Sequence, residues 1–313
     1  MKGLELSEKF YKEVGEPMLS SVFKDLMPYL AVGLVGSGSE CLGYDDEVSR
    51  DHDFEPGFCI FIPNEDVVNS KAAFSLERAY AKLPKEFMGF KRLNYDAVGG
   101  ARHGVIRISD FFLSKTGSPD GRLSVAEWFS VPEHSLLEAV GGKVFFDNLG
   151  EFSRIRERLS YYPRDIALKK LAGNLLLMGQ AGLYNYPRVL SRGETGAAGL
   201  AAHQFTEASM NAVFILNGKY KPYYKWSFRA LRELPLLNDL AEPLEFLISS
   251  GNDSATAEKK QELIKSICLS VAKEIKNAGL VSHLEPDTQT LAHLINNAIS
   301  DNNIRNQHIL SGV

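Results

Sequence analysis

Two short polar segments of the sequence contain the residues best suited to chemistry. The first is the turn Gly36-Ser37-Gly38-Ser39, which ends the apolar run 30–35, and the second is the Asp51-x-Asp53 pair. Alternate side chains of an extended strand share a face, so Asp51 and Asp53 are predicted to point the same way. Two neighbouring carboxylates repel each other, and a divalent cation relieves that repulsion. Because all these ligands are oxygens, Mg²⁺ or Mn²⁺ is favoured over zinc.

The glycine–serine turn is expected to open a short helix over 37–42. The first turn of a helix offers backbone N–H groups without partners, and the serines add hydroxyls, so this segment suits a phosphate group. Gly36, Ser37 and Ser39 are therefore candidate nucleotide-binding residues. Arg50, beside the aspartates, is either their charge partner or a further phosphate contact. A phosphate site together with two metal-binding carboxylates indicates a site for a nucleoside triphosphate (NTP).

Two other phosphate-binding motifs fail here at a residue that their chemistry needs. A dinucleotide-binding G-x-G-x-x-G motif would need glycine where Cys41 stands. A P-loop that began at Gly38 would need lysine where Tyr44 stands.

The apolar-Gly-Ser pattern followed by Asp-x-Asp resembles the signature of the nucleotidyltransferase superfamily related to DNA polymerase beta. Within it, the chain resembles bacterial two-domain proteins similar to aminoglycoside nucleotidyltransferases, in particular a group with a domain of unknown function. The segments that carry this resemblance are 49–53, 144–150, 162–163, 184–188 and 223–226. It implies Mg²⁺-dependent transfer of a nucleoside monophosphate from an NTP, ATP being favoured, to a hydroxyl acceptor. Asp51 and Asp53 would be the catalytic metal ligands.

The third carboxylate of this superfamily, which usually comes from the central strand, is not evident. The strand predicted over 104–109 contains Arg107 and no acidic residue, and Asp110 lies just past its end. Asp110 is therefore the candidate third catalytic acid, with a helix cap as the alternative interpretation. If no acid fills the role, the chain is a catalytically silent NTP-binding module of a regulatory or antitoxin-like kind.

The elements that must position these residues predict an α+β fold. Residues 1–150 are expected to form a nucleotidyltransferase-like domain, with a short mixed sheet and flanking helices, and residues 151–313 an all-α helical bundle. The strands are predicted over 30–35, 51–62 with an interruption at Pro56-Gly57, 104–109 and 143–146. Glu55 would be a reserve metal ligand only if the second strand stayed regular, and a structural carboxylate is the alternative. The helices of the first domain are predicted over 4–29 with an interruption near Gly15 and Pro17, 69–83, 123–129 and 132–140. The clearest helix of the second domain is predicted over 261–275. The last dozen residues are expected to fray.

In the resembling transferases the helical domain contributes the acceptor pocket. The segments 184–188 and 219–226 mix aromatic rings with cations that could meet a base or a phosphate, so Arg188 and Lys225 are candidate nucleotide-binding residues. The alternative is that these aromatic side chains are packing anchors. His203 and Glu207, one helical turn apart, are either an acid–base pair or a surface pair.

Composition limits the partners. A net charge of -4 over 313 residues does not suggest a protein that coats nucleic acid. The acceptor is expected to be a small molecule rather than a protein or an RNA. Three widely spaced cysteines indicate free thiols in a reducing cytoplasm. No signal peptide and no apolar run of membrane-spanning length is present, so a cytoplasmic protein without a membrane partner is expected. A homodimer is suggested by analogy alone.

Overall fold

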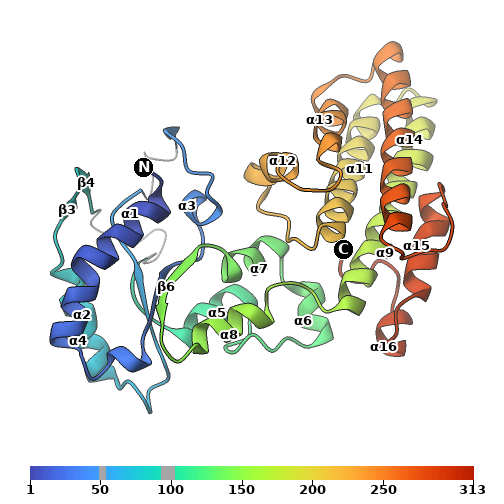
Figure 1. Ribbon diagram of the computed structural model, residues 1–313. Helices are drawn as coiled ribbons and strands as arrows, with labels where there is room; N and C mark the ends of the chain where they lie inside the picture. Colours follow the sequence, from blue (N-terminus) through green and yellow to red (C-terminus); the bar gives the residue numbers. More distant parts are fainter. Residues whose placement is uncertain (49–53, 93–102) are drawn as a thin grey trace. The chain divides into compact units, whose positions relative to one another are not determined.

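The computed structural model describes residues 1–48, 54–92 and 103–313 (Figure 1). The chain divides into unit 1, Met1–Leu123 with Ser135–Ser160, and unit 2, Ser124–His134 with Tyr161–Val313. These units differ from the predicted segments 1–150 and 151–313, because residues 124–134 belong to unit 2 and residues 151–160 to unit 1. The roles assigned to the two domains stay predictions.

Unit 1 is built on a four-stranded mixed sheet with the strand order β5-β2-β1-β6. Its strands are β1 (Ala31–Leu34), β2 (Cys59–Ile62), β5 (Gly104–Arg107) and β6 (Lys143–Asp147). Strand β1 is antiparallel to both β2 and β6, and β2 is parallel to β5. A small mixed sheet among many helices is consistent with the predicted α+β class.

The predicted second strand, 51–62, is interrupted at Pro56-Gly57, as the sequence predicts. Strand β2 begins only at Cys59, and residues 54–58 belong to no strand. Pro56 has no N–H to donate to a strand ladder, and Gly57 has no side chain to pack, which explains the late start. Residues 51–53 lie outside the described residues.

Helices cover both faces of the sheet, and the alternation of side chains along β2 explains how. Ile60 and Ile62 lie in a core with α1 (Gly3–Phe10), α2 (Glu16–Val22) and α4 (Ser70–Ala81). Phe61 points to the other face, where its ring stacks on Phe152 of α8 (Glu151–Arg158) with the centroids 4.1 Å apart. The same ring meets Phe111 of α5 (Ile108–Thr116) at 5.2 Å. Two apolar faces therefore hold the sheet in place.

Two predicted elements of unit 1 end differently from the prediction. The helix predicted over 4–29 is α1, a π-helical turn over Tyr11–Gly15 and α2, so it ends at Val22 and only a 3₁₀ turn, Met27–Tyr29, follows. The strand predicted over 104–109 ends at Arg107, and the next residues already belong to α5. The remaining elements of unit 1 are α3 (Ser39–Leu42), β3 (Glu86–Phe87) and β4 (Phe90–Lys91). Helix α7 (Glu133–Val140) starts in unit 2 and continues in unit 1.

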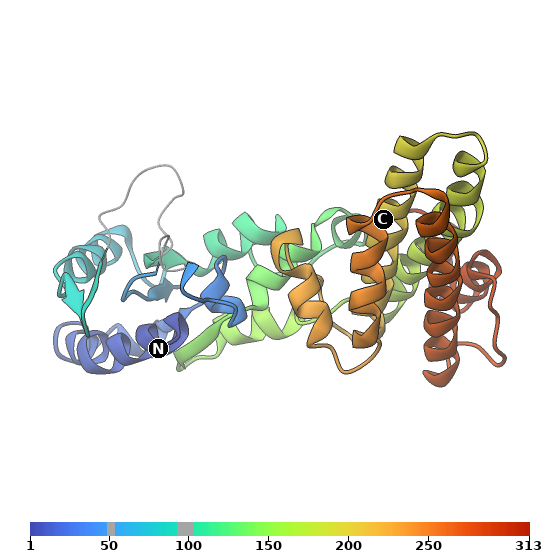
Figure 2. The ribbon, with the colours of Figure 1, turned by 90° about the horizontal axis from the view of Figure 1, so that it is seen from above.

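The described secondary-structure elements of unit 2 are all helices. A helical second part was predicted for the chain beyond residue 151. Helix α9 (Arg164–Met178) packs against α11 (Thr195–Leu216) and α15 (Thr288–Asn297). Helix α14 (Ser254–Asn277) runs beside α15 in both views (Figures 1 and 2). The remaining helices are α6 (Val125–Ser130), α10 (Tyr186–Leu190), α12 (Tyr224–Arg232), α13 (Ala241–Ser249) and α16 (Asn302–Arg305).

The final residues of the chain are held in place, contrary to the expectation that they fray. Lys169 of α9 is fully buried, and its Nζ donates to the Arg305 carbonyl at 3.1 Å and the Gln307 carbonyl at 2.7 Å. It also donates to Asn296 Oδ1 at 2.8 Å. A buried ammonium is tolerated only with such partners, so these bonds fix the C-terminal segment to the bundle.

No helix in the described ranges combines the length and the hydropathy needed to cross a membrane. The three cysteines are buried and form no disulfide.

Candidate functional site

The register of the sheet puts the end of β1, which leads into the glycine–serine turn, beside the start of β2. Gly33 of β1 lies opposite Cys59 of β2, because the two strands are antiparallel. The chain therefore leaves β1 toward the Gly36–Ser37 turn at the same end of the sheet at which it enters β2. Asp51, Asp53 and Arg50 themselves lie outside the described residues.

The glycine–serine turn has the geometry that its sequence predicts. Gly36 and Gly38 have φ angles of +106° and +119°, which residues with a Cβ rarely adopt. Gly38 is the N-cap of α3, and the predicted short helix over 37–42 is confirmed as a single turn that includes Ser39. The Ser37 side chain is exposed at this turn.

A charged cluster surrounds the Ser37 hydroxyl. Ser37 Oγ donates to Glu138 Oε2 at 2.8 Å, and Lys115 Nζ donates to Ser37 Oγ at 2.9 Å. Lys115 Nζ also donates to Glu138 Oε2 at 2.6 Å. We call Ser37, Lys115 and Glu138 the Ser37 cluster. The Lys115 and Glu138 side chains are 20% and 28% exposed, so both are within reach of a ligand at the turn.

Lys115 and Glu138 were not among the residues that the sequence pattern selected. Lys115 is on the last turn of α5 and Glu138 is on α7, and they lie 78 and 101 residues from Ser37 along the chain. No local motif marks such distant contacts. Glu138 does lie inside a predicted helix, 132–140, but nothing in that pattern indicates which helical side chain would meet the turn.

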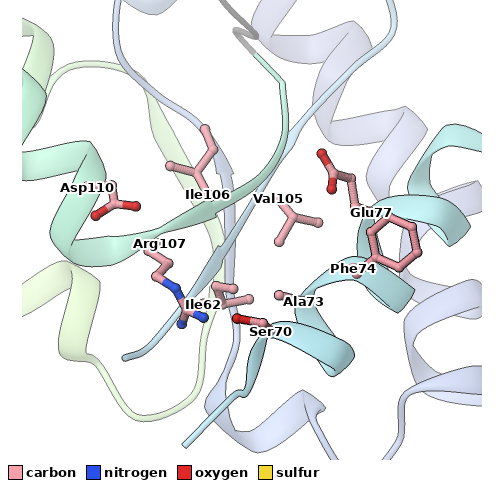
Figure 3. A pocket seen from close by; sticks show the side chains of 9 residues that line it. All are labelled: Ile62, Ser70, Ala73, Phe74, Glu77, Val105, Ile106, Arg107 and Asp110. Carbon is pink, nitrogen blue, oxygen red and sulfur yellow. The ribbon is translucent and has the colours of Figure 1, made fainter. Parts of the chain in front are cut away.

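Asp110, the candidate third acid, lies at the other end of the sheet. It is in the first turn of α5, directly after the end of β5, where Arg107 pairs with Ile62 at the end of β2. Since β2 and β5 are parallel, this end is opposite the one where Cys59 enters the sheet. Asp110 is exposed and lines a cavity of about 370 Å³ with Glu77, which lies across β5 on α4 (Figure 3). The structure therefore does not bring Asp110 to the Gly36–Ser37 turn.

Arg107 has a structural role that explains why this strand carries a cation. Its guanidinium donates to the Pro63 carbonyl at 2.8 Å and the Val68 carbonyl at 3.2 Å, and it pairs with Glu65. The side chain thereby fixes the loop that connects β2 to α4. Arg107 therefore stabilises the loop after β2, in a strand where the superfamily usually has a catalytic carboxylate.

Glu55, a reserve ligand near the Asp-x-Asp pair, is occupied by a partner. Its Oε1 lies 2.9 Å from His103 Nδ1, and both side chains are less than 10% exposed. This buried pair joins the segment before β2 to the segment before β5. The interpretation of Glu55 as a structural carboxylate agrees with this contact.

The candidate residues of the helical part lie in unit 2 and contact aromatic rings. The Arg188 guanidinium lies 4.6 Å from the centroid of the Tyr184 ring and donates to the Tyr184 hydroxyl. Lys225 Nζ lies 5.2 Å from the Trp226 ring. Glu207, predicted to pair with His203, accepts a hydrogen bond from Lys221 Nζ. No hydrogen bond between His203 and Glu207 is found among the described residues.

Within residues 1–48, 54–92 and 103–313, no three His, Cys, Asp or Glu side chains converge in a way that could hold a metal ion. The two predicted ligands, Asp51 and Asp53, lie in the gap between the first two of these ranges.

Comparisons with known proteins add a family match and one distant structural similarity. Residues 128–227, less than half of the chain, match the family described as Domain of unknown function (DUF4037). A search of curated proteins finds no match. The chain is similar to a crystal structure of a nucleotidyltransferase-like protein from Exiguobacterium sibiricum 255-15, at 11% sequence identity and a TM-score of 0.36. That alignment covers 84% of this chain and 79% of the other, but at this TM-score it does not establish a shared fold.

Proposed function

We propose that the protein is a Mg²⁺-dependent nucleotidyltransferase that moves a nucleoside monophosphate from an NTP, ATP in the first instance, to a hydroxyl acceptor. The observation that carries the proposal is the Gly36-Ser37 turn followed by Asp51-x-Asp53. The sheet register supports it, because the end of β1 and the start of β2 lie at the same end of the sheet.

The triphosphate would bind at the turn. Gly36, Ser37 and Ser39 would contribute backbone N–H groups and hydroxyls, and Arg50 a positive charge. Lys115 adds a cation that donates to the Ser37 hydroxyl at 2.9 Å, which supports a phosphate site at this turn. Arg188 and Lys225 remain proposed nucleotide contacts from unit 2.

Asp51 and Asp53 would hold the metal ion. When bound, Mg²⁺ (or Mn²⁺) neutralises triphosphate charge and stabilises the pyrophosphate leaving group. The acceptor oxygen forms a bond to the α-phosphorus, and the bond from this phosphorus to the bridging oxygen of the pyrophosphate breaks. The acceptor proton passes to a carboxylate; the sequence predicts Asp110 for this role, although Asp110 lies at the end of the sheet opposite the turn.

The test is to incubate the protein with each α-labelled NTP, Mg²⁺ and a cell extract, and to ask which molecule acquires the label. Labelling is expected to fall by about two orders of magnitude or more in Asp51→Asn and in Asp53→Asn, with the fold retained. Asp66→Asn, at an exposed acid of unit 1, is the matched control and should keep full activity. Full labelling by both aspartate variants would exclude this mechanism.

A silent NTP-binding module is the second candidate, and the position of Asp110 favours it. With Arg107 on β5 and Asp110 at the far end of the sheet, no third acid has been found beside the turn among the described residues of that strand. This alternative predicts NTP binding by calorimetry without labelling of any acceptor. In addition, full labelling by Asp110→Asn would remove Asp110 from the reaction while leaving the enzyme hypothesis intact.

A further inference from the structure

Unit 2 has a cavity of its own, formed entirely by residues of that unit. Its volume is about 370 Å³, within the usual range for small-molecule sites. Helices α9 and α11 supply Lys170, Glu207 and Asn211. The rest of the wall comes from residues 129–134, 221–224 and 312–313.

Two exposed tyrosines form one wall of this cavity. Tyr223 and Tyr224 are 49% and 71% exposed, and their ring centroids are 4.4 Å apart. The Tyr223 ring also meets His134 at 5.6 Å. Adjacent exposed rings offer flat apolar faces on which the C–H face of a ring compound can stack.

The charged side chains of the cavity balance one another. Lys170 and Lys221 are opposed by Glu133 and Glu207, and Lys221 Nζ pairs with Glu207 Oε2 at 2.5 Å. Either carboxylate would repel a polyanion, and either ammonium would repel a polycation. The balance therefore favours a ligand without net charge.

The same side chains keep hydrogen-bonding capacity. Lys170 Nζ is a buried donor with three N–H groups, and among the described residues it donates to one oxygen, the Gly312 carbonyl, at 2.8 Å. Glu133 accepts from the Tyr162 hydroxyl at 3.2 Å and from the Lys221 backbone N–H at 3.3 Å, which uses about half of its lone pairs. Donors and acceptors thus stand side by side in the cavity. A hydroxyl matches both, because it can donate and accept at once.

We propose that this cavity binds a small, neutral, hydroxyl-bearing ring compound, a sugar or a cyclic polyol, stacked on Tyr223 and Tyr224 and hydrogen-bonded to Lys170 and Glu133. Residues 221–224 of its wall belong to the segment predicted for the acceptor pocket, so this inference rests on the proposed function and names the class of acceptor. Its binding test needs no nucleotide and no metal, so it can fail separately from nucleotidyl transfer.

The test uses the full chain without nucleotide or Mg²⁺ and ligand-detected NMR with three neutral probes, glucose, ribose and myo-inositol. Spermidine and inorganic tripolyphosphate are the charged comparators. At least one neutral probe is expected to bind saturably. Tyr223→Ala and Tyr224→Ala, both at exposed positions, should each weaken its binding about tenfold, which corresponds to about 1.4 kcal/mol.

Tyr29→Ala is the matched control, because Tyr29 is an exposed tyrosine of unit 1 and is not among the residues that line this cavity. It should leave the affinity for the neutral probe unchanged. The proposal is overturned if none of the three neutral probes binds, if only a charged comparator binds, or if Tyr223→Ala and Tyr224→Ala bind as the unsubstituted protein does.

Discussion

At the scale of single residues, the Ser37 cluster has a direct consequence for phosphate binding. Glu138 Oε2 accepts from Ser37 Oγ and from Lys115 Nζ, the two side-chain donors that a phosphate oxygen at this turn would also need. In the proposed phosphate site, this carboxylate oxygen would occupy the position that a phosphate oxygen takes. A phosphate must displace it, and the cation Lys115 would then pair with the ligand instead of with Glu138.

We therefore predict opposite effects for the two charged members of the cluster. Lys115→Met should raise the Kd of Mg-ATP about tenfold, since it removes a partly exposed charge-assisted bond. Glu138→Gln should lower that Kd about fivefold, since it removes a competing anion. Calorimetry measures both values.

Lys12→Met is the control, because Lys12 belongs to another lysine–glutamate pair of unit 1, with Glu8 at 2.9 Å. It should leave the Kd of Mg-ATP unchanged. A shift of the Kd in the same direction for Lys115→Met and Glu138→Gln would contradict the competition.

A residue of the candidate site could be predicted from the sequence only where a short local segment contains the whole signal. Gly36 and Ser37 form a recognisable turn because their spacing and backbone preferences are local. Lys115 and Glu138 reach Ser37 only through the packing of α5 and α7, which no sequence window contains. Asp110 shows the converse: it is near a strand end in sequence, but the parallel pairing of β5 with β2 puts it at the wrong end of the sheet for the turn.

At the scale of elements, periodic segments were predicted well and short transitions poorly. The strand over 30–35 and the helix over 261–275 were found as β1 and as part of α14, since a buried run and a long apolar stripe are strong signals. The start of α5 at Ile108 was missed. The β-branched residues Val105, Ile106 and Ile108 favour a strand throughout this segment, and such a composition does not reveal where the strand turns into a helix.

The connection between α7 and β6 provides a prediction at this scale. Gly142 has φ +73°, and a Cβ there would lie 2.1 Å from the Leu34 carbonyl oxygen, so only glycine lets β6 begin beside β1. Gly142→Ala is expected to lower the free energy of unfolding by about 3 kcal/mol, from backbone strain and a backbone clash together. Urea unfolding measures this loss.

Gly196→Ala provides the comparison within a helix of unit 2. A Cβ at Gly196 would meet no atom of the described residues within 4 Å, and the position is helical. The free energy of unfolding of the Gly196→Ala variant should therefore equal that of the unsubstituted protein or be slightly higher. Equal stability of the Gly142→Ala variant and the unsubstituted protein would show that β6 can begin without this close approach.

At the scale of the whole molecule, buried tyrosines in both units set the response to alkaline pH. Burial raises the pKa of Tyr161, Tyr162 and Tyr220 of unit 2, where the Glu133 charge adds to the effect. In unit 1, burial raises the pKa of Tyr11 to about 12. A tyrosine of the unfolded chain loses its proton near pH 10, whereas these buried tyrosines of the folded protein keep theirs to higher pH. Because deprotonation is then easier in the unfolded chain, alkaline pH stabilises the unfolded chain relative to the folded protein. Stability should be intact below about pH 10 and should fall as pH rises above it.

Tyr11→Phe isolates one of these groups. The Tyr11 hydroxyl is buried and has no hydrogen-bond partner among the described residues, so its removal should cost no stability at pH 7. At about pH 11 the variant should be more stable than the unsubstituted protein, because one ionisation that favours unfolding is gone. Guanidinium midpoints across this pH range measure the difference. A large loss at pH 7 would mean that the hydroxyl has a bonding partner after all.

The bonds of Lys169 bear on how the chain can be shortened. Two of the oxygens that receive its protons belong to Arg305 and Gln307, near the far end of the sequence. A protein cut before residue 305 would contain an ammonium group in a dry interior with most of its acceptors gone. The charge could escape only by losing its proton or by admitting water between α9 and α15. The carbonyl oxygens of Arg305 and Gln307 therefore help to stabilise the bundle interior, although most residues of this segment are exposed or half-buried, and fusion partners are better attached elsewhere.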